Sequence, residues 1–144
     1  MHVEHVLEIA APLQRLWALT LEVEGWPAFI PTISSVERLD GGPLQTGSRV
    51  RLKQPGQAAR VWTVTALKPG RRFAWSTPLP GTLLTGVHEL EPTDLGTRNT
   101  LRVELTGWAS FVLGALLRRQ IAGAIAQENE GFRRAATSLD ATGT

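Results

Sequence analysis

The sequence predicts an α+β domain in which a curved antiparallel sheet of about six to seven strands wraps around one long C-terminal helix. The only long helical stretch comes last, from about Ser110 to Leu139. Strand-like segments follow one another from Ile33 onward, and turn signals recur about every ten residues, as in a meander. One strand and two short helical pieces precede them. Because a sheet bent in this way seldom closes tightly on a single helix, we expect an apolar cavity between them.

Two short helices are expected between the first two strands. Apolar and polar residues alternate from Val3 to Ile9, which is the period of a half-buried strand. Pro12 then suits the first position of a helix, because its missing N–H costs nothing there, and helical spacing continues to about Leu21. The apolar, proline-bounded segment 25–31 predicts a second short helix with its aromatic side chains turned inward.

The remaining strands are separated by turns that are rich in glycine and proline. We expect these strands at residues 33–39, 49–53, 59–67, 73–77, 82–91 and 99–106, with a loop at 78–81. No internal repeat or interdomain linker interrupts the chain. Residues 1–139 are therefore expected to form one domain, and residues 140–144 a flexible tail.

The final helix carries an apolar stripe that we expect to face the sheet. The stripe contains Leu113, Leu116, Leu117, Gln120, Ile121, Ala124, Glu128, Phe132 and Ala135. Small residues occupy its middle, at Gly123 and Ala124, and Glu128 adds a carboxylate. A helix packed flat on a full core would favour leucine or isoleucine there, so this composition indicates a helix that roofs a cavity.

Composition indicates a folded protein without a nucleic-acid partner. Hydrophobic residues make up 42% of the 144 residues and charged residues 19%. The pI near 9.9 reflects a net charge of only +2 in a chain without Tyr or Cys and with few lysines. The arginines are scattered and form no basic patch. The lack of Cys excludes disulfides, thiolate catalysis and Cys-ligated zinc, and no other metal-ligand spacing is present.

The longest apolar run, from Trp108 to Leu117, is about half the length that spans a bilayer and stops at Arg118-Arg119. The first five residues carry no signal-peptide pattern, so a cytoplasmic location is expected. The run could touch a membrane surface transiently. We favour the alternative, in which these first helical turns pack against the sheet or against a partner subunit of a homodimer; a monomer is equally compatible.

Three stretches of the sequence resemble one large superfamily. They are segment 9–12 followed by Leu16-Trp17, segment 23–31, and segment 90–92 with 96–98. Together with the order of elements, they are similar to the helix-grip (SRPBCC) superfamily of START domains, birch-pollen-allergen-like proteins and bacterial polyketide cyclase/dehydrase-like proteins. Segment 23–31 is also similar to the coenzyme-Q-binding subgroup. The resemblance spans nearly the whole chain and implies a ligand-binding cavity, but the fold hosts both carriers and enzymes.

Three titratable side chains could carry chemistry in such a cavity. His5 and His88 are in phase with apolar strand neighbours, so they could orient a ligand or shuttle a proton, or simply hydrogen-bond within a partly polar core. Glu128 could act as an acid or base, or pair with a polar ligand group, if burial raises its pKa. Its alternative is a solvent-facing position or an ion pair with Arg60 or Arg102.

The five tryptophans suggest a stacking surface for a planar ligand, with Trp75 as the first choice. The other tryptophans are expected mainly in the core or at the rim. The residues expected to line the cavity are His5, Leu7, Trp26, Phe29, Val50, Leu52, Trp62, Phe73, Trp75, Leu84, His88, Val103, Leu117, Gln120, Ile121, Ala124 and Glu128.

The leading hypothesis is a non-catalytic protein that binds a hydrophobic small molecule, such as a lipid, a quinone or a polyketide-like compound, without a cofactor. The alternative is a cyclase or dehydratase that uses His5, His88 or Glu128 for proton transfer. The absence of Tyr narrows the choice of acids in that enzyme.

Overall fold

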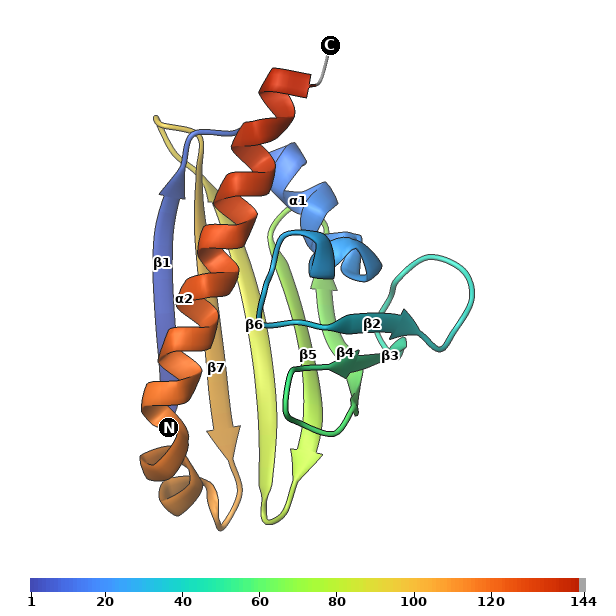
Figure 1. Ribbon diagram of the computed structural model, residues 1–144, viewed down its shortest axis with the longest axis vertical. Coiled ribbons are helices and arrows are strands. Elements are labelled where there is room, and N and C mark those ends of the chain that lie inside the picture. The colour runs from blue at the N-terminus through green and yellow to red at the C-terminus, as the bar shows by residue number, and fades with distance from the viewer. Residues whose placement is uncertain (143–144) are drawn as a thin grey trace.

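The computed structural model describes residues 1–142, which form one seven-stranded antiparallel sheet with a long helix across one face (Figure 1). The strands lie in the order β1-β7-β6-β5-β4-β3-β2. Figure 1 shows β2 and β3 running crosswise to β6 and β7, so the sheet is strongly curved. The elements are β1 (His2–Ile9), α1 (Leu13–Leu21), η1 (Val23–Ala28), β2 (Ser35–Arg38), β3 (Arg49–Lys53), β4 (Arg60–Lys68), β5 (Arg72–Leu79), β6 (Thr82–Pro92), β7 (Thr97–Thr106) and α2 (Ser110–Thr142).

The fold class predicted from the sequence is confirmed. The chain has the curved antiparallel sheet, the long C-terminal helix and the two short helices between β1 and β2, and η1 is a 3-10 helix. No helix within residues 1–142 is both long and apolar enough to cross a membrane.

The observed boundaries lie within three residues of the expected ones, and two of the differences alter a turn and a terminus. The loop expected at 78–81 is shorter, because β5 continues to Leu79 and pairs there with Thr82 of β6. Gly81 makes this tight turn possible with a φ of +63°, a conformation that favours glycine. Helix α2 continues past Leu139 to Thr142. The last two residues of the expected tail, 143–144, lie outside the described residues.

Helix α2 lies over one side of the sheet. It contacts β1 and β7 much more extensively than β6. Figure 1 likewise shows α2 in front of β1 and β7, with β4 and β5 to one side of it. The curled strands therefore enclose a space beside the helix, and only part of that space is filled by side chains.

An aromatic cluster fills the space next to the C-terminal half of α2. Trp26 of η1 is 1% exposed, and its ring lies 6.4 Å from Phe73, 5.3 Å from Trp75, 5.3 Å from His88 and 5.6 Å from Phe132 of α2. Most of these contacts are edge-to-face, the favoured arrangement for aromatic pairs. The indole N–H of Trp26 donates a hydrogen bond to the carbonyl of Leu19 at 3.0 Å, so this buried polar group has a partner.

The buried stripe of α2 differs from the expected one. Its fully buried members are Ile125, Asn129, Phe132 and Ala136. Leu116 is 75% exposed, so its expected inward orientation is wrong. The error arose at Asn129, because a polar residue was not expected at a buried position and the buried face of the helix was therefore misassigned.

Two glycines of α2 offer a matched test of this packing. A Cβ at Gly131 would lie 2.5 Å from the carbonyl oxygen of Phe29, whereas a Cβ at Gly123 would meet no heavy atom within 4 Å. We expect Gly131→Ala to lower the free energy of unfolding by roughly 1–3 kcal/mol, because backbone must move to admit the methyl group. Gly123→Ala should raise it by about 0.5–1 kcal/mol, since alanine favours the helix. Urea unfolding measures both values, and a stabilised Gly131→Ala would contradict the close contact.

Candidate functional site

The space beside the N-terminal half of α2 is a chamber of about 370 Å³, which we call the outer chamber. Its walls come from α2, from strands β3 to β7 and from the loop between β3 and β4, and most of them are apolar. The lining consists of Leu52, Gln54, Gln57, Ala58, Arg60, Trp62, Leu79, Leu84, Val103, Leu117, Gln120, Ile121, Ala124, Ile125 and Glu128.

A smaller space of about 70 Å³, the inner chamber, adjoins the outer chamber. Six residues line both chambers: Leu52, Gln54, Trp62, Val103, Ile125 and Glu128. The inner chamber continues toward the aromatic cluster, where Trp26, Trp75 and His88 line it. The two chambers therefore lie next to each other, and the inner chamber is the one that reaches the aromatic cluster.

Small residues keep the wall of the inner chamber open. Gly86 of β6 pairs with Trp75 of β5, and a Cβ at Gly86 would lie 3.2 Å from the indole nitrogen of Trp75. The Trp75 ring lies 5.5 Å from the Trp62 ring, tilted by 35°. The glycine thus lets two indoles lie together over the neighbouring strand, and they give the chamber an aromatic wall.

Glu128 is the carboxylate that both chambers share. It has no hydrogen bond or ion pair to any residue within the described part of the chain. Arg102 instead bonds to Glu89 at 3.0 Å and to Glu104 at 2.9 Å, and Arg60 lines the outer chamber without an ion pair to Glu128. Burial among apolar side chains raises the pKa of Glu128 to about 7. The carboxyl is therefore partly protonated near neutral pH.

His88 supplies a second polar group to the inner chamber. It is 4% exposed, and its Nδ1 has no hydrogen-bond partner among residues 1–142. The rings of Trp26, Phe73 and Phe132 lie within 5.7 Å of it. This desolvation lowers the pKa of His88 to about 3, so the imidazole is neutral at pH 7.

Trp62 contributes a third polar group to the chambers. Its indole N–H is buried and has no acceptor among the described residues. An unmet donor of this kind costs free energy, which a ligand carrying an acceptor atom would recover. The chambers are therefore apolar overall. Their few polar groups, on Trp62, His88 and Glu128, can fix the orientation of a bound ligand.

Twelve of the seventeen residues expected to line the cavity do line one or both chambers. They are Trp26, Leu52, Trp62, Trp75, Leu84, His88, Val103, Leu117, Gln120, Ile121, Ala124 and Glu128. Their contact with a ligand stays a prediction.

The other five lie elsewhere. Phe73 and Val50 are both 0% exposed in the packed core, and Leu7 packs at its edge. Phe29 lines a surface recess beside Arg134 and packs edge-to-face against Phe132. Phe73 and Val50 face inward as expected, but the aromatic cluster and its neighbours fill the space that they face. An inward orientation on a strand therefore did not locate the cavity.

His5 belongs to a polar contact that joins β1, β7 and α2. The side-chain amide of Asn129 lies 2.9 Å from Nδ1 of His5 and donates to the carbonyl of Asn99 at 3.1 Å. Asn99 donates in turn to Oδ1 of Asn129 at 2.9 Å. Of the two interpretations of His5, hydrogen bonding within a partly polar core is the one that the geometry matches.

Several lining residues were missed from the sequence. Gln54, Gln57 and Ala58 belong to an irregular loop whose position has no periodic signal. Ile125 was missed because it lies outside the expected stripe of α2. Gly86 is the missed lining residue that the sequence could have indicated, since an isolated glycine within a strand often marks a close approach of another group.

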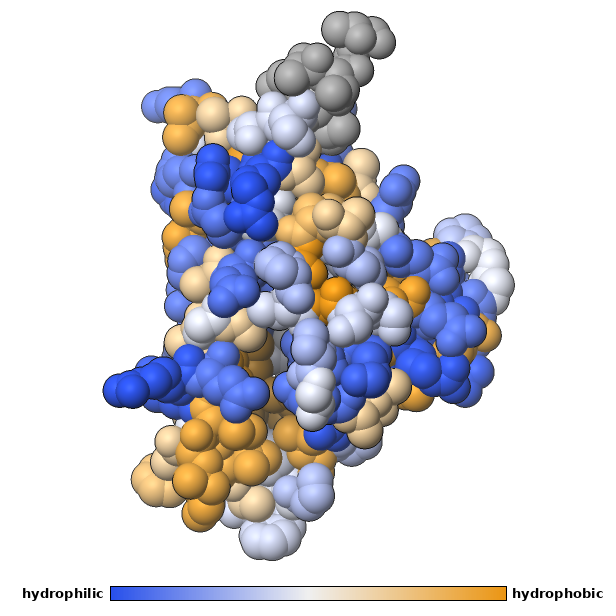
Figure 2. Space-filling model, viewed as in Figure 1, coloured by the Kyte–Doolittle hydropathy of each residue, from blue (hydrophilic) through white to orange (hydrophobic). Residues whose placement is uncertain are grey.

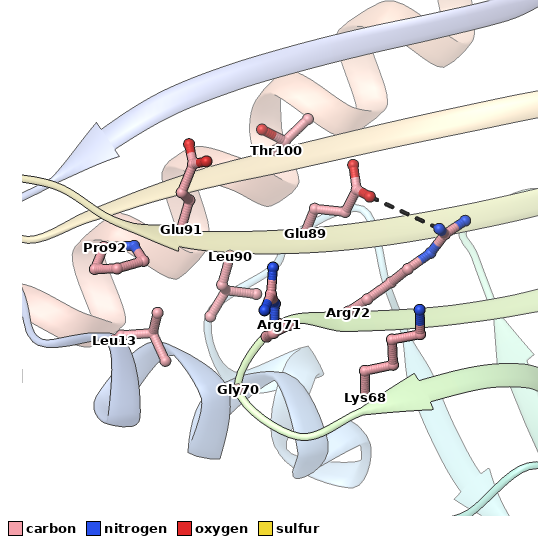
Figure 3. Close-up of a pocket in the computed structure, with 10 residues that line it drawn as sticks. All are labelled: Leu13, Lys68, Gly70, Arg71, Arg72, Glu89, Leu90, Glu91, Pro92 and Thr100. Carbon is pink, nitrogen blue, oxygen red and sulfur yellow. Dashed lines mark ion pairs between the residues drawn. The ribbon is translucent and has the colours of Figure 1, made fainter.

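A larger recess of about 880 Å³ is lined by the end of β4, by β5, β6, β7 and α1, and by the β4–β5 turn, without α2 (Figure 3). Its charges are mixed: Lys68, Arg71 and Arg72 line it together with Glu89 and Glu91, and Arg72 lies 3.9 Å from Glu89 (Figure 3). Exposed charges of this kind interact only weakly, because water screens them. We therefore assign the functional site to the smaller chambers, where unpaired polar groups are buried in apolar walls.

Glu128 and His88 give opposite pH dependences of stability. Because the pKa of Glu128 rises from 4.5 to about 7 on folding, the native state binds more protons between these values, so the free energy of unfolding falls as pH rises through them. The pKa of His88 falls from 6.5 to about 3, so the free energy of unfolding falls as pH drops through that range.

We expect Glu128→Gln to raise the free energy of unfolding at about pH 8 by on the order of 2 kcal/mol, less than full linkage because Glu128 is only half-buried. Urea unfolding of both proteins at about pH 5 and about pH 8 measures the change. Glu130→Gln is the matched control on α2. It should not raise the free energy of unfolding, because the Arg133 guanidinium lowers the pKa of Glu130. An equal gain in both variants would show that Glu128 is not desolvated.

Solved structures share this architecture. A Thermus thermophilus protein, TTHA0849, superposes with a TM-score of 0.75 at 17% identity, over 96% of this chain and 99% of its own. The Zhui aromatase/cyclase from Streptomyces sp. R1128 superposes with a TM-score of 0.67 at 24% identity, over 94% of this chain and 95% of its own. At these identities the likeness shows the helix-grip fold, which hosts several functions.

Sequence comparisons agree with the fold. A Streptomyces halstedii protein classed by name with the polyketide cyclases is 37% identical over 65 residues, which are 43% of this chain. The match covers 56% of that protein, so the chain spans about half the length of this curated relative. The family model described as polyketide cyclase/dehydrase and lipid transport matches residues 1–137. With the helix-grip fold and its apolar chambers, this match shows that the chain belongs to the polyketide cyclase/dehydrase and lipid transport family.

Proposed function

We propose that the protein binds and carries a hydrophobic small molecule in the two chambers beneath α2. The outer chamber supports this most directly, since about 370 Å³ of mostly apolar space is within the usual range for small-molecule sites. The family description, which includes lipid transport, supports the same class of function.

The polar groups of the chambers define the chemistry of such a ligand. The indole N–H of Trp62 is a donor only, and the protonated carboxyl of Glu128 is also able to donate. Both groups match a ligand oxygen, such as a carbonyl or hydroxyl oxygen. The aromatic wall formed by Trp62 and Trp75 suits a planar body. We infer an oxygen-bearing, planar or polycyclic ligand rather than a saturated hydrocarbon.

A cyclase or dehydratase is the second candidate, and the pKa of Glu128 favours it. A carboxyl with a pKa of about 7 lies in the range of an efficient general acid or base at neutral pH. His88 is less suited to acid catalysis, because its pKa of about 3 leaves it without a proton to donate at pH 7. His5 is bonded to Asn129 and lines neither chamber. The enzymatic alternative therefore depends on Glu128.

Ala124→Trp tests the location of the site. Ala124 lines the outer chamber, so an indole there should fill the space and lower the affinity for menadione, a two-ring quinone, at least tenfold, while the thermal midpoint stays close to that of the parent. Tryptophan fluorescence quenching measures the binding, and the parent protein must bind menadione for the test to apply. Gln127→Trp is the matched control on the exposed side of the same helix and should bind as the parent does.

Unchanged affinity in a folded Ala124→Trp protein would place the ligand site elsewhere. Unfolding of this variant would show instead that Ala124 lies in a tight core. A large loss of affinity in Gln127→Trp would mean that added aromatic bulk on α2 disturbs binding from any position.

Glu128→Gln separates the carrier from the enzyme. For a carrier, we expect the variant to retain ligand binding within about tenfold and to lose its pH dependence near pH 7, because glutamine offers a neutral amide at the same place. For an enzyme, removal of the acid or base should lower kcat by roughly 100-fold or more at similar binding. Mass analysis of ligand incubated with each protein measures turnover. Turnover that is unchanged in Glu128→Gln would exclude the catalytic role of Glu128.

A further inference from the structure

The first turns of α2 present an exposed apolar surface. Trp108 is 90% exposed, Phe111 84%, Val112 63% and Leu116 75%. We call these four residues the mouth patch. Figure 2 shows hydrophobic residues gathered over the first turns of α2, next to hydrophilic ones. The expectation that these turns pack against the sheet is therefore wrong for these side chains. A contiguous exposed apolar surface of this kind indicates a partner.

The mouth patch borders the outer chamber. Leu116 belongs to the patch, and the next residue, Leu117, lines the chamber. Trp108 rests on the β5–β6 turn, where a Cβ at Gly81 would lie 2.7 Å from its ring. Leu79, just before that turn, lines the chamber as well. A partner on the mouth patch would therefore lie beside this wall of the chamber.

The charges around the mouth patch indicate which kind of partner fits it. Arg118 and Arg119 follow the patch directly, are exposed, and form no ion pair with any side chain of residues 1–138. The segment 107–127 contains no Asp or Glu. A two-fold dimer through this surface would bring the same segment of two chains together, so the arginines would meet no acid from it. An anionic surface would pair with both arginines and cover the apolar side chains.

We propose that the mouth patch docks on the surface of an anionic lipid bilayer, with Arg118 and Arg119 at the phosphate groups. Aromatic and aliphatic side chains followed by arginines are typical of interfacial helices. One helical face and two arginines give weak, reversible binding. This docking does not depend on the proposed function, because it needs no ligand in the chambers.

Sedimentation with vesicles tests the proposal on the full chain. We expect binding to vesicles of equal parts phosphatidylcholine and phosphatidylglycerol, weaker binding at high salt, and little binding to phosphatidylcholine alone. Phe111→Ser with Leu116→Ser should lower the binding at least tenfold, since two apolar contacts are lost. Leu95→Ser, at a residue 58% exposed on the β6–β7 turn, is the apolar control and should change nothing.

The role of charge is tested separately. Arg118→Glu with Arg119→Glu should lower binding to the anionic vesicles roughly tenfold or more. Lys68→Glu with Arg71→Glu is the control, because it has the same net charge as the first double variant but changes the recess that α2 does not line. It should bind the anionic vesicles nearly as the parent does.

Three results would overturn the proposal. They are no binding of the parent protein to anionic vesicles, equal binding by the patch variants, or equal loss in the two charge variants. A dimer that is lost in Phe111→Ser, without vesicle binding by the parent, would assign the mouth patch to a second copy instead. Because the protein is tested without ligand, each result leaves the menadione experiment unaffected.

Discussion

Phe132 packs edge-on against Trp26, 5.6 Å between ring centroids, and against His88 at 5.7 Å, inside the curve of the sheet. The rest of the structure depends on this contact. Phe132 and Trp26 are almost completely buried, and a buried aromatic side chain contributes roughly 1.5–3 kcal/mol by leaving water. Asn129, one helical turn earlier, bonds to β1 and β7 and fixes the rotation of α2. Held in this way over β1 and β7, α2 contacts β6 only slightly, and the strands beyond β6 curl away from it (Figure 1).

The chambers follow from that geometry. Toward its N-terminus, α2 faces the curled strands with small or medium side chains, such as Ala124 and Ile121, which do not fill the gap. The same apolar surroundings determine the state of the polar groups. They lower the pKa of His88 and raise the pKa of Glu128, so both groups tend toward their neutral forms near pH 7. Neutral donors and acceptors in an apolar chamber suit an uncharged, oxygen-bearing ligand better than an ionic one.

The sequence predicted the fold well because its signals are local. Alternation in the strands, glycine and proline in the turns, and one long helical segment each depend on residues close together in the chain. Glu128 was also identifiable, since a carboxylate on an apolar stripe is conspicuous. Asn129 was not, because its burial depends on hydrogen bonds to Asn99 and His5 on other elements. Phe73 and Val50 show the remaining difficulty: alternation tells which face of the sheet a residue occupies, but not whether that face is filled or hollow.

The central claim is that the space beneath α2 is a ligand chamber rather than loosely packed core. Native mass spectrometry of the protein purified from its own cells tests it most directly, because a ligand enclosed by α2 and the sheet should survive gentle purification. We expect a species heavier than the 15.7 kDa chain by the mass of one small molecule, which denaturation releases as an oxygen-bearing, apolar compound. The mass of the bare chain in every charge state would contradict the account.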